Sequence, residues 1–216
     1  LYKKPTVVNN VETLAAIPGI LKHGAKSFSS IGNVKSAGTK LVCLDSLFKN
    51  PGVYEMDMGT PMKKIIYDIG GGFIKPVKAL QVGGPLGGVI PIKEVEKLNL
   101  DFQEFTKAGF MLGHGSIVSI PEDFNMIKYI HHLFKFSAEE SCGKCFPGRL
   151  GSYRGKEMFD QAINKTNKIP IKLLNELLVT MQKGSLCALC GAIPLPIQNI
   201  LKYFTDEFKT DINQEA

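Results

Sequence analysis

The protein has 216 residues, a net charge of +6 and 44% hydrophobic residues, which is enough to bury one or two sizeable cores. No stretch reaches the roughly 18 apolar residues that a membrane span needs, and the start, LYKKPTVVNN, lacks the apolar segment of a signal peptide. Most lysines are scattered singly, without the clustered basic and aromatic residues of a nucleic-acid surface, so neither membrane insertion nor nucleic-acid binding is expected.

The first segment of the chain, residues 1–32, predicts a helix. Val11–Leu21 can be helical, with Asn9 or Asn10 as the residue that caps its start. Pro18 falls within or between these helical turns. The sequence begins abruptly and without Met, so we expect it to be part of a longer chain.

Residues 38–92 predict a small sheet with one helix across it. The segments TKLVCLDSL, GVYEMDM, VKALQVGG and GVIPI read as short strands, and PMKKIIYDIG reads as a helix that the following glycines end. In GVYEMDM, apolar residues at alternate positions form one buried face. Cys43, in the run KLVCLD, is expected to be a small buried hydrophobe. Residues 109–120 predict a glycine-rich turn and a further strand.

From residue 121 onward the pattern becomes helical and predicts a bundle of about four short helices. The first helix opens at Phe124, after a Pro-Glu-Asp sequence, and Ser137 and Glu140 have the spacing of a capping box. Three apolar stripes at helical spacing mark the buried faces. They consist of Phe124, Ile127, Ile130, Leu133 and Phe134; of Ile171, Leu174, Leu177, Leu178 and Met181; and of Ile197, Ile200, Leu201, Phe204 and Phe208.

Four of the five cysteines form two C-x2-C pairs, Cys142 with Cys145 and Cys187 with Cys190. An odd number of cysteines without a secretory signal argues against a disulfide scaffold. A C-x2-C turn directs two thiolates at one centre, so two pairs supply the four soft ligands that zinc or an iron–sulfur cluster takes. The sequence therefore predicts a metal centre.

The choice between zinc and iron depends on the surroundings of the two pairs. The 41 residues of helical pattern between the pairs exceed the roughly 15–20 residues of structural zinc modules. The second pair lies in the apolar segment GSLCALCGAIPLP, and a dry shell suits an electron carrier. Lys144, Arg149 and Arg154 are candidates to offset cluster charge. These features favour an iron–sulfur cluster, with zinc as the alternative.

Several motifs together resemble the flavin-bearing, NADH-oxidising subunit of respiratory complex I. The related subunits of NAD-dependent formate dehydrogenases and bidirectional hydrogenases belong to the same family. The motifs are KPTVVNNVETLA, PGVYEMDMGTPMKKIIYDIGGG, QVGGPLGG, ESCGKCFPGRLGSYRG and GSLCAL, and they cover nearly the whole chain.

The resemblance implies an α+β fold with three parts. Residues 1–32 would be the tail of a Rossmann-like domain that binds FMN and NADH, and residues 33–118 a small β-grasp domain of the ubiquitin-like, SLBB type. Residues 119–216 would form a four-helix bundle that binds a [4Fe–4S] cluster. Most of the FMN and NAD(H) pocket would then lie upstream of this sequence.

The resemblance also implies site residues. Asn9, Asn10 and Thr13 would contact the flavin, although an N-cap and turn explains them equally in isolation. Ala188 and Leu189 would approach the flavin from the cluster side. No residue of this chain is expected to carry out acid–base catalysis.

One position departs from the family pattern, which is C-x2-C-x2-C with a fourth cysteine some 40 residues later. Gly148 stands where the third cysteine is expected, and Cys190 stands where the family has glycine. The hypothesis is a swap, in which Cys142, Cys145, Cys187 and Cys190 hold the cluster. The alternatives are a three-cysteine or open-site cluster, a zinc ion, or an empty site.

The function implied by the resemblance is electron transfer between FMN, reduced by NADH, and the [4Fe–4S] cluster. The expected partners are other subunits of a redox complex, including a thioredoxin-like [2Fe–2S] subunit. The expected location is cytoplasmic, peripheral on the inner face of the membrane through those partners. The alternative is a non-catalytic module that docks subunits and has a zinc-bound or vacant cysteine site.

Overall fold

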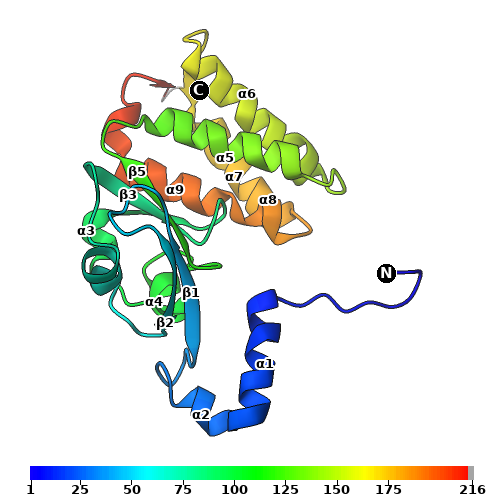
Figure 1. The fold of residues 1–216 in the computed structure, drawn as a ribbon. Helices are drawn as coiled ribbons and strands as arrows, with labels where there is room; N and C mark the ends of the chain where they lie inside the picture. The colour runs from blue at the N-terminus through cyan, green and yellow to red at the C-terminus, as the bar shows by residue number, and fades with distance from the viewer. Residues whose placement is uncertain (214–216) are drawn as a thin grey trace.

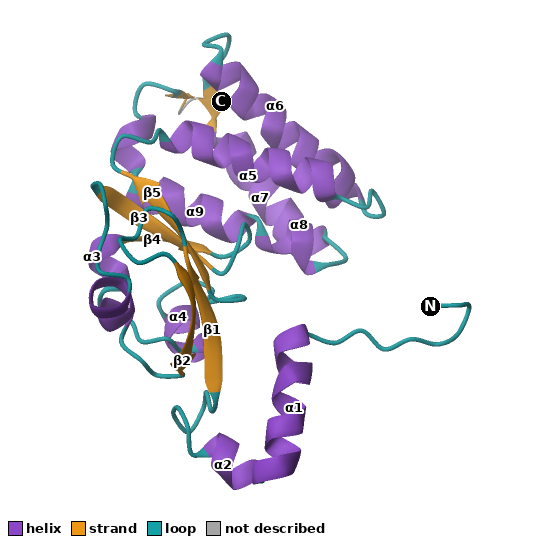
Figure 2. Ribbon diagram, viewed as in Figure 1, coloured by secondary structure: helices purple, strands orange, loops and turns teal. Residues whose placement is uncertain are grey.

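The computed structural model describes residues 1–213 as a mixed α/β fold, with a sheet on one side and a group of helices on the other (Figures 1 and 2). The sheet has the strand order β2-β1-β5-β3-β4, in which β1 and β5 are parallel and the other neighbours antiparallel. Its strands are β1 Thr39–Leu44, β2 Gly52–Asp57, β3 Val77–Val82, β4 Gly88–Pro91 and β5 Ser116–Pro121. Two short strands, β6 Ile169–Pro170 and β7 Ile212–Asn213, pair separately.

Helical segments precede, interrupt and follow the sheet. Those before and within it are α1 Val11–His23, α2 Ala25–Ser29, the π-helix η1 Lys64–Ile69, α3 Ile92–Val95 and α4 Phe102–Lys107. Those after it are α5 Met126–Glu140, the π-helix η2 Pro147–Gly151, α6 Ser152–Ile163, α7 Ile171–Gly184, α8 Ala188–Ala192, α9 Pro194–Tyr203 and the 3-10 turn η3 Thr205–Phe208.

The two faces of the sheet pack against different elements. One face buries Val42, Leu80 and Ile117 in a cluster with side chains of η1, α3 and α4. The opposite face places Ala79, Val89 and Ile120 in a second cluster with apolar residues of α5 to α9. The sheet is therefore a layer shared by two cores, and the helices reach only the part of it formed by β3, β4 and the end of β5.

The uncovered part of the second face corrects the expectation for Cys43. Successive side chains of a strand point to opposite faces. Because Val42 and Leu44 of β1 point into the first core, Cys43 and Leu41 point to the side that the helices do not reach, and both are exposed. The predicted burial of Cys43 is therefore wrong, although the predicted strand is confirmed.

Polar contacts join the sheet to the helical part. The Tyr129 hydroxyl in α5 donates a hydrogen bond of 2.6 Å to Gln81 Oε1 in β3. The Glu207 carboxylate in η3 accepts a hydrogen bond of 3.1 Å from the backbone N–H of Met126 and pairs with Lys78 of β3. Glu207 thus ties the start of α5 to the sheet.

Capping side chains determine where helices α5 and α1 begin. The side chain of Asn125 caps α5 by accepting from the backbone N–H of Lys128, so the helix begins at Met126, after the predicted Phe124. Ser137 is fully buried inside α5, so its spacing to Glu140 is not a capping box. Asn10 caps α1, as predicted, through a hydrogen bond of 3.0 Å from the Thr13 N–H.

Helix α1 stands apart from the rest of the fold (blue in Figure 1). It has no buried residue, and its apolar side chains, such as Val11 and Leu21, are exposed. The Glu12 carboxylate connects it to the sheet, because it accepts a hydrogen bond of 2.8 Å from the Leu41 N–H and pairs with Lys40. The helix therefore contributes little to either core.

Small residues form the buried face of η2 and α6. Gly148, Gly151, Ser152 and Gly155 are all buried. A Cβ at Gly151 would lie 3.0 Å from Met181 Cγ in α7, and the Ser152 hydroxyl donates a hydrogen bond of 2.6 Å to the Gly148 carbonyl. The sequence PGRLGSYRG thus lets α5, α7 and α8 approach this segment closely.

Gly155 and Gly19 provide a matched test of this close packing. A Cβ at Gly155 would lie 2.1 Å from the buried Phe134 ring, whereas a Cβ at Gly19 in α1 meets nothing within 4 Å. We expect Gly155→Ala to lower the free energy of unfolding by about 1–3 kcal/mol through overpacking. We expect Gly19→Ala to leave it unchanged or to raise it by up to about 1 kcal/mol. Urea unfolding measures both values, and an equal response at both positions would contradict the packing described.

Candidate metal centre

The first cysteine pair lies in the irregular segment between α5 and η2. Gly143, between Cys142 and Cys145, adopts a φ of 72°, which favours glycine and turns the chain sharply. The Arg149 guanidinium donates a hydrogen bond of 2.7 Å to the Gly143 carbonyl, and the Arg149 N–H donates one of 2.9 Å to the Cys145 carbonyl. Arg149 therefore holds the turn that carries both thiols.

The second pair lies at the start of the short helix α8. Cys187 is the N-cap residue of α8, and its carbonyl accepts a hydrogen bond of 3.2 Å from the Gly191 N–H. Cys190 lies one turn later and is only 2% exposed, whereas Cys187 is exposed. One thiol of this pair is thus buried and the other open to solvent.

Electrostatics show that the structure brings the two pairs together. Burial raises the pKa of the Cys190 thiol, and the neighbouring thiols of Cys187, Cys145 and Cys142 raise it further, against a hydrogen bond with Ser141. Backbone hydrogen bonds, the largest from Leu186, lower the pKa of the Cys145 thiol. Leu186 directly precedes the second pair, so a hydrogen bond joins the two cysteine loops. The four predicted thiols therefore share one site.

Gly148 lies between these thiols. A Cβ at Gly148 would lie 3.1 Å from Cys145 Sγ, 3.2 Å from Cys190 Sγ and 3.3 Å from Ser141 Oγ. The position therefore faces the cysteine site, and the absence of a side chain leaves its space to sulfur. The sequence reasoning missed Ser141, whose only signal is its place directly before Cys142.

The donor set of the site can be compared with the needs of a single metal ion and of a cluster. Among residues 1–213, no three Cys, His, Asp or Glu side chains are grouped so that they could hold one metal ion. A cluster spreads its ligands around several iron and sulfide atoms, and it takes four thiolates as its ligands. The donor set and the glycine that faces it therefore fit an iron–sulfur cluster.

The segments that carry the cysteines expose both thiols and apolar side chains. Cys142 and Cys187 are exposed, and around the two pairs the chain also exposes Phe146, Leu150 and Leu186, the last two at 57% and 74%. The Arg149 guanidinium lies over the Phe146 ring, 4.8 Å from its centroid. Exposed apolar residues of this kind, when they adjoin one another, mark a contact surface.

The other residues singled out from the sequence lie in two places. Ala188 is exposed and Leu189 is partly buried, both at the start of α8 beside Cys187. Asn9, Asn10 and Thr13 are exposed at the start of α1, where the Asn10 side chain accepts hydrogen bonds from the Thr13 N–H and hydroxyl. Figure 1 shows α1 separated from the helices that carry the cysteines.

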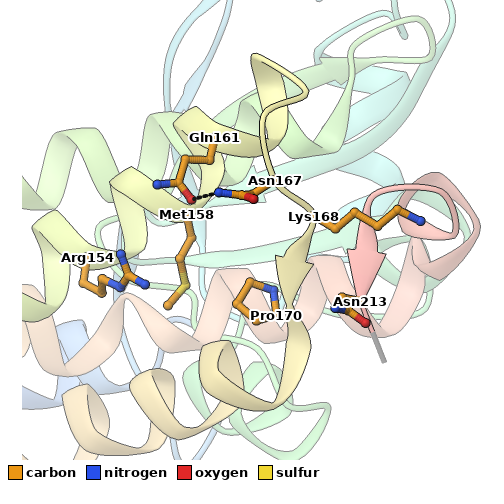
Figure 3. A pocket seen from close by; sticks show the side chains of 7 residues that line it. All are labelled: Arg154, Met158, Gln161, Asn167, Lys168, Pro170 and Asn213. Carbon is orange, nitrogen blue, oxygen red and sulfur yellow. Dashed lines mark hydrogen bonds between the residues drawn. The ribbon is translucent and has the colours of Figure 1, made fainter. Parts of the chain in front are cut away.

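Arg154, in α6, lines a pocket to which no cysteine contributes. Its guanidinium pairs with Glu157 at 3.2 Å and lines a pocket of about 370 Å³, in which Asn167 donates a hydrogen bond of 3.2 Å to Gln161 (Figure 3). The pocket is lined by Arg154, Met158, Gln161, Asn167, Lys168, Pro170 and Asn213. These contacts offer no support for the predicted role of Arg154 beside the cluster, whereas Lys144 is exposed between Cys142 and Cys145.

A four-thiol site fits an iron–sulfur binding domain, and comparison with known families agrees. Residues 128–211 match the family described as the NADH-ubiquinone oxidoreductase-F iron–sulfur binding region. This match confirms the resemblance noted from the sequence motifs. The match supports a [4Fe–4S] cluster as the cofactor of the helical part.

Relatives match nearly the whole chain. The NADP-reducing hydrogenase subunit HndC of Solidesulfovibrio fructosivorans is 35% identical over 99% of this chain and 44% of its own length. The F subunit of the NADH-quinone oxidoreductase of Escherichia coli is 34% identical over 99% of this chain and 48% of its own length. The chain thus spans about half the length of these relatives.

A solved structure confirms the fold. A chain in the crystal structure of an NAD+-reducing [NiFe]-hydrogenase in the H2-reduced state superimposes with a TM-score of 0.86 at 26% identity. The match covers 97% of this chain and 36% of that one. Within residues 1–213, every helix is too short or too polar to cross a bilayer.

The two thiols with shifted pKa values should react differently with an alkylating reagent. In metal-free protein, Cys145 should become reactive at a lower pH than an ordinary thiol, since only the thiolate reacts and its pKa is lowered. Cys190 should react last and need higher pH, because it is buried and its pKa is raised. Brief iodoacetamide exposure across a pH series, read by mass spectrometry, measures this order.

Cys43 serves as the reference thiol, because it is exposed and lies on β1, outside the site. If Cys190 reacted as fast as Cys43 at every pH, its burial against η2 would be wrong.

Proposed function

We propose that the protein is the electron-transfer part of an NADH:acceptor oxidoreductase subunit, in which electrons pass between an FMN reduced by NADH and a [4Fe–4S] cluster. The observation that carries the proposal is the convergence of four thiols in a segment that matches an iron–sulfur binding region. When bound, such a cluster accepts and donates electrons one at a time. The protein supplies ligands, position and surroundings.

The proposed ligands are Cys142, Cys145, Cys187 and Cys190. Each pair comes from its own tight turn, so the centre would join the end of α5 to the start of α8. Hydrogen bonds to the sulfurs and the exposure of the site are among the factors that set a cluster's reduction potential. The backbone hydrogen bond from Leu186 to Cys145 is one such contact.

The finer description of the fold belongs to the same proposal. Residues 33–118 would form a β-grasp domain of the SLBB type and residues 119–216 a four-helix bundle. The first core cluster, whose buried members run from Val42 to Ile117, supports this division. Residues 1–32 would be the tail of a flavin-binding domain. Support comes from α1, which has no buried residue of its own and exposes apolar side chains.

The flavin would lie against the open side of the cysteine site. Ala188 and Leu189 would face it from α8, and Asn9, Asn10 and Thr13 would contact it from the start of α1. The exposed apolar side chains of Phe146, Leu150 and Leu186 support a covering element on this side. The chain itself needs no general acid or base, because its proposed task is to hold and exchange electrons.

The proposed setting is a multi-subunit redox complex with a thioredoxin-like [2Fe–2S] partner, on the cytoplasmic face of the membrane. The names of the matched proteins, a quinone oxidoreductase subunit and hydrogenase subunits, support such a complex. In a hydrogenase or formate dehydrogenase setting, electrons would run towards NAD+. The quinone oxidoreductase setting would reverse that direction.

The cofactor content of anaerobically purified protein tests the proposal. We expect a brown protein with iron and acid-labile sulfide in nearly equal amounts, about four of each per chain. Dithionite reduction should produce an EPR signal. Cys142→Ala should remove most of the iron, because Cys142 is a proposed ligand, whereas Cys43→Ala should keep it.

A colourless protein with zinc and no sulfide would overturn the proposal. That result would support the alternative function, a docking module in which the thiols hold zinc.

A further inference from the structure

Position 148 faces the thiol site although it carries no side chain. Gly148 is buried in η2, and its carbonyl is fixed by the hydrogen bond of 2.6 Å from the Ser152 hydroxyl. A Cβ built there would point at three polar atoms: Cys145 Sγ, Cys190 Sγ and Ser141 Oγ, at 3.1, 3.2 and 3.3 Å. A side chain at 148 would therefore enter the space between the two cysteine loops.

The contacts are too close for an additional sulfur. Contacts of 3.0–3.4 Å are shorter than nine in ten Cβ contacts found in proteins. Even an added methyl group would therefore force the neighbouring side chains to move. A thiol extends one atom beyond Cβ and would meet the sulfur of Cys190. A thiol at 148 and a thiol at 190 therefore compete for the same space.

We infer that positions 148 and 190 are interchangeable sources of one cluster ligand, and that this protein supplies it from α8 through Cys190. The inference rests on the proposed function, since it assigns one ligand of the proposed cluster. It also explains Gly148 in steric terms, because any side chain there would displace the thiol that ligates.

The surroundings of Cys190 favour a role as a cluster ligand over that of a thiol that binds nothing. Cys190 is 2% exposed, and the buried residues Ile193 and Pro194 follow the end of α8. The Cys190 thiol is buried, whereas the thiols of Cys142 and Cys187 are exposed and that of Cys145 is partly exposed. Cys190 would thus supply the one buried ligand of the proposed set.

The experiment moves the thiol from one position to the other in the full-length protein, purified anaerobically. The variants are Cys190→Ala, the near-isosteric Cys190→Ser and the double variant Gly148→Cys/Cys190→Ala, with Cys43→Ala as the matched control. Removal of the Cys190 sulfur frees the space that a thiol at position 148 would need, so the double variant retains only the close contacts with Cys145 and Ser141. Iron, acid-labile sulfide and the EPR spectrum are measured, and circular dichroism of each metal-free variant reports folding.

We expect both Cys190 variants to lose bound iron by more than about tenfold, since even an outer hydrogen-bond partner of a metal ligand contributes about 10- to 100-fold in affinity. The double variant should recover iron, sulfide and an EPR signal to within about twofold of the unmodified protein. Cys43→Ala should match the unmodified protein. This pattern supports the interchange.

Two results would overturn it. Unchanged iron and EPR in both Cys190 variants would show that Cys190 is not a ligand, while the persisting cluster would leave the proposed function standing. Loss of iron without recovery in a folded double variant would show that position 148 cannot replace position 190. By contrast, an unmodified protein without iron or sulfide would refute the proposed function itself.

Discussion

The close approach of η2 and α6 to their neighbours is the contact on which the cysteine site depends. Gly151 packs against α7, Gly155 against the Phe134 ring of α5, and Gly148 against the two sulfurs of Cys145 and Cys190. Larger residues on this face would push α8 away from the turn that carries the first pair. The cysteine site thus depends on the close approach of segments that lie far apart in the sequence, which glycine permits because it has no side chain.

Much of the fold follows from periodicity and capping. The strands of the sheet, the cap at Asn10 and the apolar stripe from Ile127 to Phe134 lie where the sequence predicts them. These features are local, since a cap needs a neighbour three residues away and a stripe needs only helical spacing. The C-x2-C spacing likewise predicts two thiols on one turn. The resemblance to the family adds the order of the parts.

What the sequence does not predict depends on contacts between segments. The apolar run around Cys43 predicts a strand, but which of its faces is covered depends on how far α5 and α9 reach over the sheet. The Ser137–Glu140 spacing fits a capping box, yet Ser137 lies inside α5, because the helix cap is Asn125. The π-helical turn η2 and the hydrogen bond from Leu186 to Cys145 have no sequence signal. Such features arise from contacts between segments that are distant in the sequence, so the sequence pattern of one segment does not reveal them.

The four thiols differ in exposure, and this difference affects how easily the site is oxidised when the subunit is alone. Thiols such as those of Cys142 and Cys187, open to solvent, can be reached by dioxygen, peroxide and chelators, and an oxidised sulfur no longer ligates. A partner surface that covered Phe146 and Leu186 would therefore also shield these thiols from oxidants. With such a partner, the proposed cluster would have to be inserted before the partner binds, and the isolated subunit would be the oxygen-sensitive form.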